Sequence, residues 1–146
     1  MPRHAHPIDP EFGQHLLRDA TVQEIQLELF RRSVAAELHV DEFIGVLLAN
    51  RNLWHGAVID RLGVNEGGFW LQPSSMIKLR DIDGNFWNAD TLYVLCDSRA
   101  AADELVAKLP MERFGCLAKV EDDQRIIRRA LGGGKEGPVI VSFWWD

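Results

Sequence analysis

Residues 91–110 read TLYVLCDSRAAADELVAKLP, and this stretch decides the fold class. The uninterrupted apolar run from Leu92 to Cys96 is typical of a strand that is buried on both faces of a sheet. Asp97 and Ser98 follow as helix caps, and Pro110 ends the helix that they begin. A buried strand that leads directly into a helix indicates a protein of mixed helix and sheet.

The rest of the C-terminal half repeats this pattern. We expect a strand over Cys116–Val120, a short helix over Gln124–Leu131 that ends at three glycines, and a last strand over Pro138–Trp145. Two consecutive strand-helix-strand units favour parallel pairing with right-handed crossovers. A split, ferredoxin-like arrangement with antiparallel neighbours is the alternative.

The N-terminal third has the pattern of two helices. Thr21 and Glu24 have the spacing at which a hydroxyl and a carboxylate reciprocally satisfy free backbone N–H groups, so the first helix begins near Thr21. We expect Asp41 to cap a second helix, which ends at the polar residues 50–52.

From Trp54 onward, β-branched and aromatic residues are broken by turn residues, which indicates a β-meander. Its strongest turn signal is Asp83-Gly84. A type I′ hairpin turn needs positive φ at both central residues, and this pair tolerates it.

The predicted fold class is therefore α+β, with a helical N-terminal third, a β-meander, and then strand-helix-strand-helix-strand forming one mixed sheet packed by helices. A chain of 146 residues matches the usual size of one domain. Prolines and the absence of apolar periodicity predict a flexible tail over residues 1–14. Residues 15–146 are expected to form a single domain.

The composition is that of an ordinary globular protein, with 47% apolar and 26% charged residues. No apolar run approaches the length of about 20 residues that crosses a bilayer, and no secretory signal is visible, so we expect cytoplasmic localisation and no membrane binding. The net charge of -6 argues against general nucleic-acid binding, which relies on Lys and Arg. Cys96 and Cys116 are expected to stay reduced.

Aromatic residues give the main functional signal. Three clusters join Phe to Trp: Phe69-Trp70, Phe86-Trp87 and Phe143-Trp144-Trp145. Neighbouring side chains of a strand point to opposite faces, so each cluster places a large ring on each side of the sheet. One face meets the helices, and the other needs a second layer, a ligand or another copy of the protein. The predicted binding residues are the tryptophans of these clusters, Trp70, Trp87, Trp144 and Trp145, together with Phe143. The alternative is a three-layer fold whose own helices cover both faces.

A second candidate site contains Cys96 and Arg99, at the predicted carboxyl end of a central strand. Ligands of open α/β sheets gather at this edge, and a helix N-terminus lowers a thiol pKa and attracts anions. The phosphatase-like spacing of Cys, five residues and Arg is absent, because that position is Ala102. His55 is a candidate base without a visible carboxylate partner. The plainer interpretations are a buried cysteine and a structural imidazole.

No catalytic residue, metal site or cofactor is predicted. His4 and His6 lack a third metal ligand. Arg125, Arg128 and Arg129 form a basic helix face, which we interpret as solvated in preference to phosphate-binding.

We therefore expect a small non-enzymatic protein that acts by protein-protein association or self-association. The expected form is a homodimer through an aromatic sheet face or through the C-terminal strand Val139 to Trp145. The alternative is a small-molecule binder or small enzyme that uses the strand edge from Cys96 to Arg99.

Overall fold

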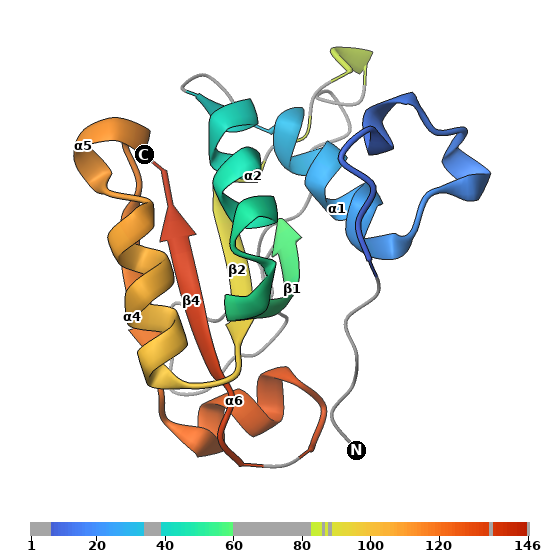
Figure 1. Cartoon of the computed structure of the whole chain (residues 1–146). Coiled ribbons are helices and arrows are strands. Elements are labelled where there is room, and N and C mark those ends of the chain that lie inside the picture. Colours follow the sequence, from blue (N-terminus) through green and yellow to red (C-terminus); the bar gives the residue numbers. More distant parts are fainter. Residues whose placement is uncertain are drawn as a thin grey trace.

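The computed structural model describes residues 7–33, 39–59, 83–85, 87, 89–134 and 136–145. Figure 1 shows their helices and strands, which are α1 (Val22–Arg31), α2 (Val40–Ala49), β1 (Trp54–Ile59), β2 (Thr91–Cys96), α4 (Arg99–Lys108), α5 (Met111–Phe114), β3 (Leu117–Glu121), α6 (Gln124–Ala130) and β4 (Val139–Trp144). Short 3-10 helices are η1 (Phe12–Gln14), η2 (Leu17–Asp19) and η4 (Arg51–Leu53). None of the helices in these ranges combines the length and apolar character that a membrane span needs.

The strands form one sheet in the order β1-β2-β4-β3, which confirms the α+β class. Each neighbouring pair is antiparallel, so the expectation of a mixed sheet with parallel crossovers is wrong for these strands. The split alternative is the one observed, because the last strand, β4, lies between β2 and β3. β4 has a strand on each side, so its backbone hydrogen bonds are used within the sheet, and the homodimer expected through the C-terminal strand stays a prediction that concerns its side chains.

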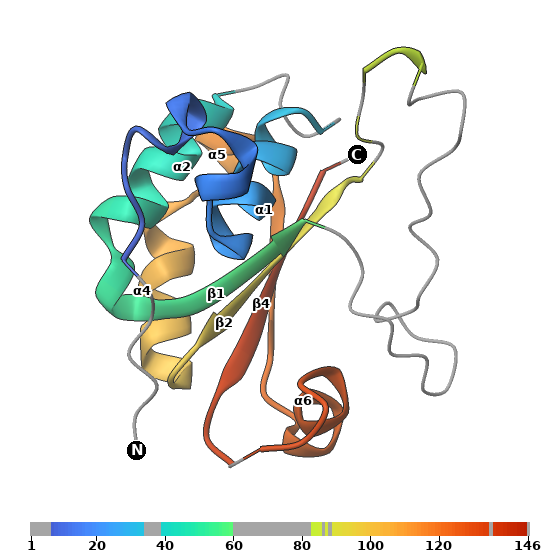
Figure 2. The same ribbon diagram turned by 90° about the vertical axis from the view of Figure 1, so that its right-hand side faces the viewer.

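The two faces of the sheet are covered by different helices. Figure 2 shows α2, α4 and α5 on one side of the sheet and α6 on the other. At the centre of the face that α2 covers, Phe43 of α2 packs edge-on against Phe143 of β4, with ring centroids 5.2 Å apart. Phe30, Phe114 and Trp145 surround Phe43 at centroid distances of 5.3 to 5.4 Å. This aromatic cluster anchors the helices to the sheet.

The predicted start of the first helix is confirmed. The Thr21 side chain accepts a hydrogen bond from the Glu24 N–H, and the Glu24 carboxylate accepts one from the Thr21 N–H. The predicted cap of the second helix is wrong, because α2 begins at Val40 and its N-cap is His39, at φ 58°. The same helix ends at Asn50, as expected.

The buried strand and its helix are confirmed: β2 is followed by α4, which is capped by Ser98 and ends before Pro110. β1 is the first strand of the predicted meander, and residues 60–82, where most of the remaining meander was expected, lie outside the described ranges. The hairpin turn at Asp83-Gly84 is not observed. Asp83 is helical, and the positive φ in this stretch belongs to Asn85, at 56°.

The first helical turn of the chain packs against α1. Phe12 is buried, and the Asp9 N–H donates to the Glu24 carboxylate at 3.1 Å. Asp9 to Gln14, which the sequence places in the tail, therefore belong to the packed part of the chain.

Candidate interaction surface

The predicted binding residues separate into buried and accessible groups. Phe143 and Trp145 are core residues, exposed by 0% and 7%. The Trp145 indole donates to the Phe114 carbonyl at 2.9 Å, so its polar group is also satisfied inside the protein. Trp87 is half-buried, and its indole donates to the Ile59 carbonyl at the end of β1. Trp70 lies outside the described residues.

Trp144 is the aromatic residue of this group that reaches the surface, with 39% of its area exposed. It points to the opposite face from its neighbour Phe143, as the strand alternation predicts. Its direct cross-strand neighbour on β3 is Leu117, which is 53% exposed. The two side chains therefore form an exposed apolar pair, which we call the Leu117–Trp144 pair.

The strand that carries Leu117 is at the edge of the sheet. β3 pairs with β4 on its inner side, and no other strand of the described chain lies on its outer side. Leu117, Ala118 and Lys119 are all exposed. An edge strand with exposed residues is a template for pairing with another polypeptide.

The opposite edge of the sheet is closed. The Gln23 side chain of α1 donates to the Ala57 carbonyl at 2.9 Å and accepts from the Ala57 N–H at 2.8 Å. Gln26 accepts from the Ile59 N–H at 3.1 Å. Side-chain amides thus replace a neighbouring strand along β1, because they offer the same donor and acceptor groups as a peptide bond. Among the described residues, hydrogen bonds from α1 side chains cover the outer side of β1, and no strand pairs with the outer side of β3.

The alternative site around Cys96 is not equipped for nucleophilic chemistry. The Cys96 thiol is fully buried, and burial, followed by the charge of Asp97, raises its pKa to about 12. A thiol that stays protonated at neutral pH is a poor nucleophile. Arg99 is exposed but binds Asp103 at 2.9 Å and Asp122 at 2.7 Å, so its charge is neutralised within the chain.

His55 does have a carboxylate partner, which the sequence did not reveal. Its Nε2 is hydrogen-bonded to Asp97 at the end of the neighbouring strand β2. Both side chains lie at the surface, with 36% and 64% exposure. The nearby Cys96 thiol is buried, so it is not accessible to this pair as a nucleophile. No group of three His, Cys, Asp or Glu side chains in the same ranges is placed to hold a metal ion.

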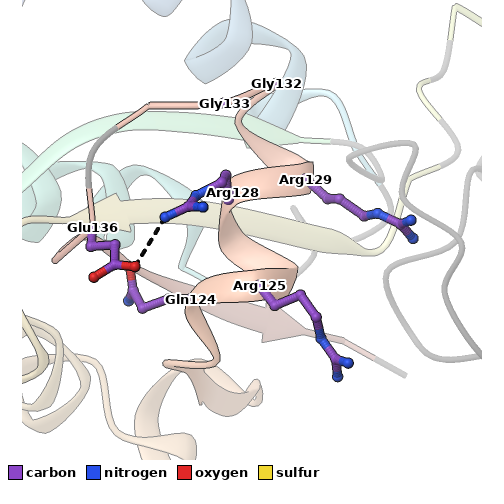
Figure 3. A pocket seen from close by; sticks show the side chains of 7 residues that line it. All are labelled: Gln124, Arg125, Arg128, Arg129, Gly132, Gly133 and Glu136. Atoms are coloured by element: carbon purple, nitrogen blue, oxygen red, sulfur yellow. Dashed lines mark hydrogen bonds and ion pairs between the residues drawn. The ribbon is translucent and has the colours of Figure 1, made fainter.

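The basic face of α6 borders a hollow beside the glycine turn (Figure 3). Arg128 points across this hollow and binds Glu136 at 3.0 Å. Arg125 and Arg129 extend from the other side of the helix, away from Glu136. An anion in the hollow would have to displace the carboxylate that Arg128 already binds, so we do not assign a phosphate site here.

Comparisons with protein-family models, with curated proteins and with solved structures find no match.

The sequence prediction found Trp144 but missed Leu117, Gln23 and Gln26. A signal for Leu117 was present: it shares the strand parity of Lys119 and Glu121, which marks the face of β3 that is away from the core. No comparable signal existed for the two glutamines, because their partners on β1 are more than thirty residues away along the chain.

Proposed function

We propose that the chain acts by associating with a polypeptide strand along the outer side of β3, with the Leu117–Trp144 pair as the apolar anchor. The role is binding, not catalysis. One observation carries the proposal: an exposed Leu and Trp lie side by side at the one sheet edge of the described chain that α1 does not cover.

The mode of binding follows from general properties of sheet edges. An added strand gains backbone hydrogen bonds, which supply affinity without regard to sequence. Side chains beside the edge supply specificity, and tryptophan is enriched among the residues that dominate binding energies. The Leu117–Trp144 pair provides both the area and the position for such an anchor.

Other exposed apolar residues lack this combination. Leu16, Leu17 and Val22 are exposed by 57%, 76% and 78%, but they lie in or beside the helices η2 and α1. Helical backbone forms its hydrogen bonds internally and offers no ladder to a partner. These positions therefore serve as controls for exposure alone.

Site-specific photocrosslinking in the cells that make the protein tests the proposal. A photoreactive phenylalanine analogue replaces Leu117, and in a control protein it replaces Val22. We expect one discrete adduct from position 117, none of comparable yield from position 22, and loss of the adduct when Trp144→Ser is added. Equal crosslinking from both positions, or an adduct that is indifferent to Trp144→Ser, would overturn the proposal.

A further inference from the structure

We infer that the strand that adds to β3 is β3 of a second copy of this chain, in an antiparallel pair whose two-fold axis passes through Val120. This inference rests on the function proposed above and specifies its partner. The order of charges along β3 supports this pairing.

Lys119 and Glu121 project from the same face of β3, since they lie opposite Ser142 and Ile140, alternate residues of β4. In an antiparallel pair centred on Val120, Lys119 of each copy faces Glu121 of the other. Two opposite-charge pairs then flank one Val-Val pair. Cross-strand pairs of opposite charge stabilise a sheet, and like charges in direct opposition destabilise it.

Other registers of the same pair are less favourable. A two-fold axis at Lys119 places two ammonium groups opposite each other. An axis at Ala118 leaves both Glu121 side chains beyond the paired segment. The charges of β3 therefore match those of a second β3 when the axis lies at Val120. The central Lys119 disfavours pairing with strands that do not place an acidic residue opposite it.

The same register gives a role to the Leu117–Trp144 pair. Leu117 is brought opposite the second copy's Asp123, the residue that caps α6. α6 lies on the opposite side of the sheet from α2 (Figure 2), and Trp144 faces that side because its neighbour Phe143 packs against α2. The first turn of that helix, with the exposed Arg125, thus approaches the Trp144 ring, and an arginine over an indole face is a favourable contact.

Charge reversal tests the register. Lys119→Glu and Glu121→Lys are made separately and together, and molar mass is measured by sedimentation equilibrium. Each single variant should show a dissociation constant at least about tenfold above that of the wild type, because it creates two like-charge pairs. An equal mixture of the two single variants should form a heterodimer, and the double variant a homodimer, because both restore the opposite charges.

Arg18→Glu, an exposed charge reversal on η2, is the matched control and should leave the dissociation constant unchanged. Thermal unfolding confirms that each variant is folded. Glu121→Lys also removes the hydrogen bond that the Glu121 carboxylate accepts from the Asp123 N–H, which is a second cause of weaker dimerisation in that variant alone. The mixture of the two single variants separates the causes, because it restores the opposite charges without restoring this hydrogen bond. A wild type that is monomeric at high concentration overturns the inference, as does a mixture that stays monomeric while the wild type dimerises. If the wild type is monomeric but position 117 still gives a Trp144-dependent adduct to another protein, the proposed function stands and the second copy is excluded.

Discussion

The carboxylate of Glu24 joins two parts of the N-terminal region. It is 3% exposed and accepts hydrogen bonds from the Thr21 N–H at 2.8 Å and the Asp9 N–H at 3.1 Å. The bond from Thr21 is the largest cause of a lowered pKa for Glu24, and the bond from Asp9 acts in the same direction, against the effect of burial. The charged form is thus favoured by folding.

Glu24→Gln is therefore expected to lower the free energy of unfolding by about 1 to 2 kcal/mol at pH 7, since it weakens a helix cap. A carboxyl with a lowered pKa stabilises the fold above its ordinary value of 4.5, and this contribution is lost as the pH falls through the folded-state pKa. Urea unfolding should show the gap between wild type and variant closing as the solution is acidified below that value. The exposed Glu104→Gln is the control, and a gap that is constant with pH would contradict the assignment.

Cys96 is expected to resist alkylation in the folded protein, because burial raises the pKa of its thiol to about 12. Cys116 is also buried, with a pKa raised to about 11, and should behave in the same way. Mass spectrometry after iodoacetamide treatment at pH 8 should find both thiols unmodified until denaturant is added. Rapid modification of native Cys96 would restore the strand-edge site as a candidate.

At the scale of single residues, local patterns were predictable from the sequence and conformational exceptions were not. Thr21 and Glu24 are three residues apart, so their capping interaction can be inferred without knowledge of the fold. The N-cap of α2 was missed because His39 adopts a left-handed conformation, and Asp41 nearby has the residue type that usually caps a helix.

Among the elements, the two edges of the sheet differ in how they are protected. Gln23 makes two hydrogen bonds to Ala57 of β1, and these stand in for a missing strand. Gln23→Ala should lower the free energy of unfolding by about 1 to 3 kcal/mol, because both backbone groups lose their partner. Gln14→Ala, which removes an exposed bond to Glu11, should change it by less than about 0.5 kcal/mol. Equal effects in denaturant unfolding would mean that Gln23 does not protect the edge.

Element types were predicted more successfully than element pairing. The apolar run of β2 and the caps of α4 are local signals, and both elements were expected. The position of β4 between β2 and β3 depends on contacts across 19 to 53 residues, such as Glu121 with Ile140 and Thr91 with Trp144. Periodicity does not encode such pairings, so the sequence could not show that the backbone of β4 is paired on both sides.

At the scale of the whole molecule, two adjacent tryptophans have different roles. Trp145 stabilises the fold, and Trp144 is the proposed contact for association. Trp145→Ala should lower the free energy of unfolding by about 3 to 5 kcal/mol, because the ring packs against Phe30 and Phe43 in the core. Trp144→Ala should lower it by no more than about 1 kcal/mol, since that ring is 39% exposed. Urea unfolding measures both values, and a large loss from Trp144→Ala would assign that residue to the core.

Hydrogen exchange across a range of protein concentrations tests most directly whether the molecule associates along β3. The amides of Leu117–Glu121 should exchange more slowly as concentration rises, while Ala57 and Ile59 of β1 keep constant rates because α1 already covers them. Trp144→Ser should abolish the concentration dependence. Rates in β3 that do not respond to concentration, or slowing that is confined to other elements, would contradict association through this edge.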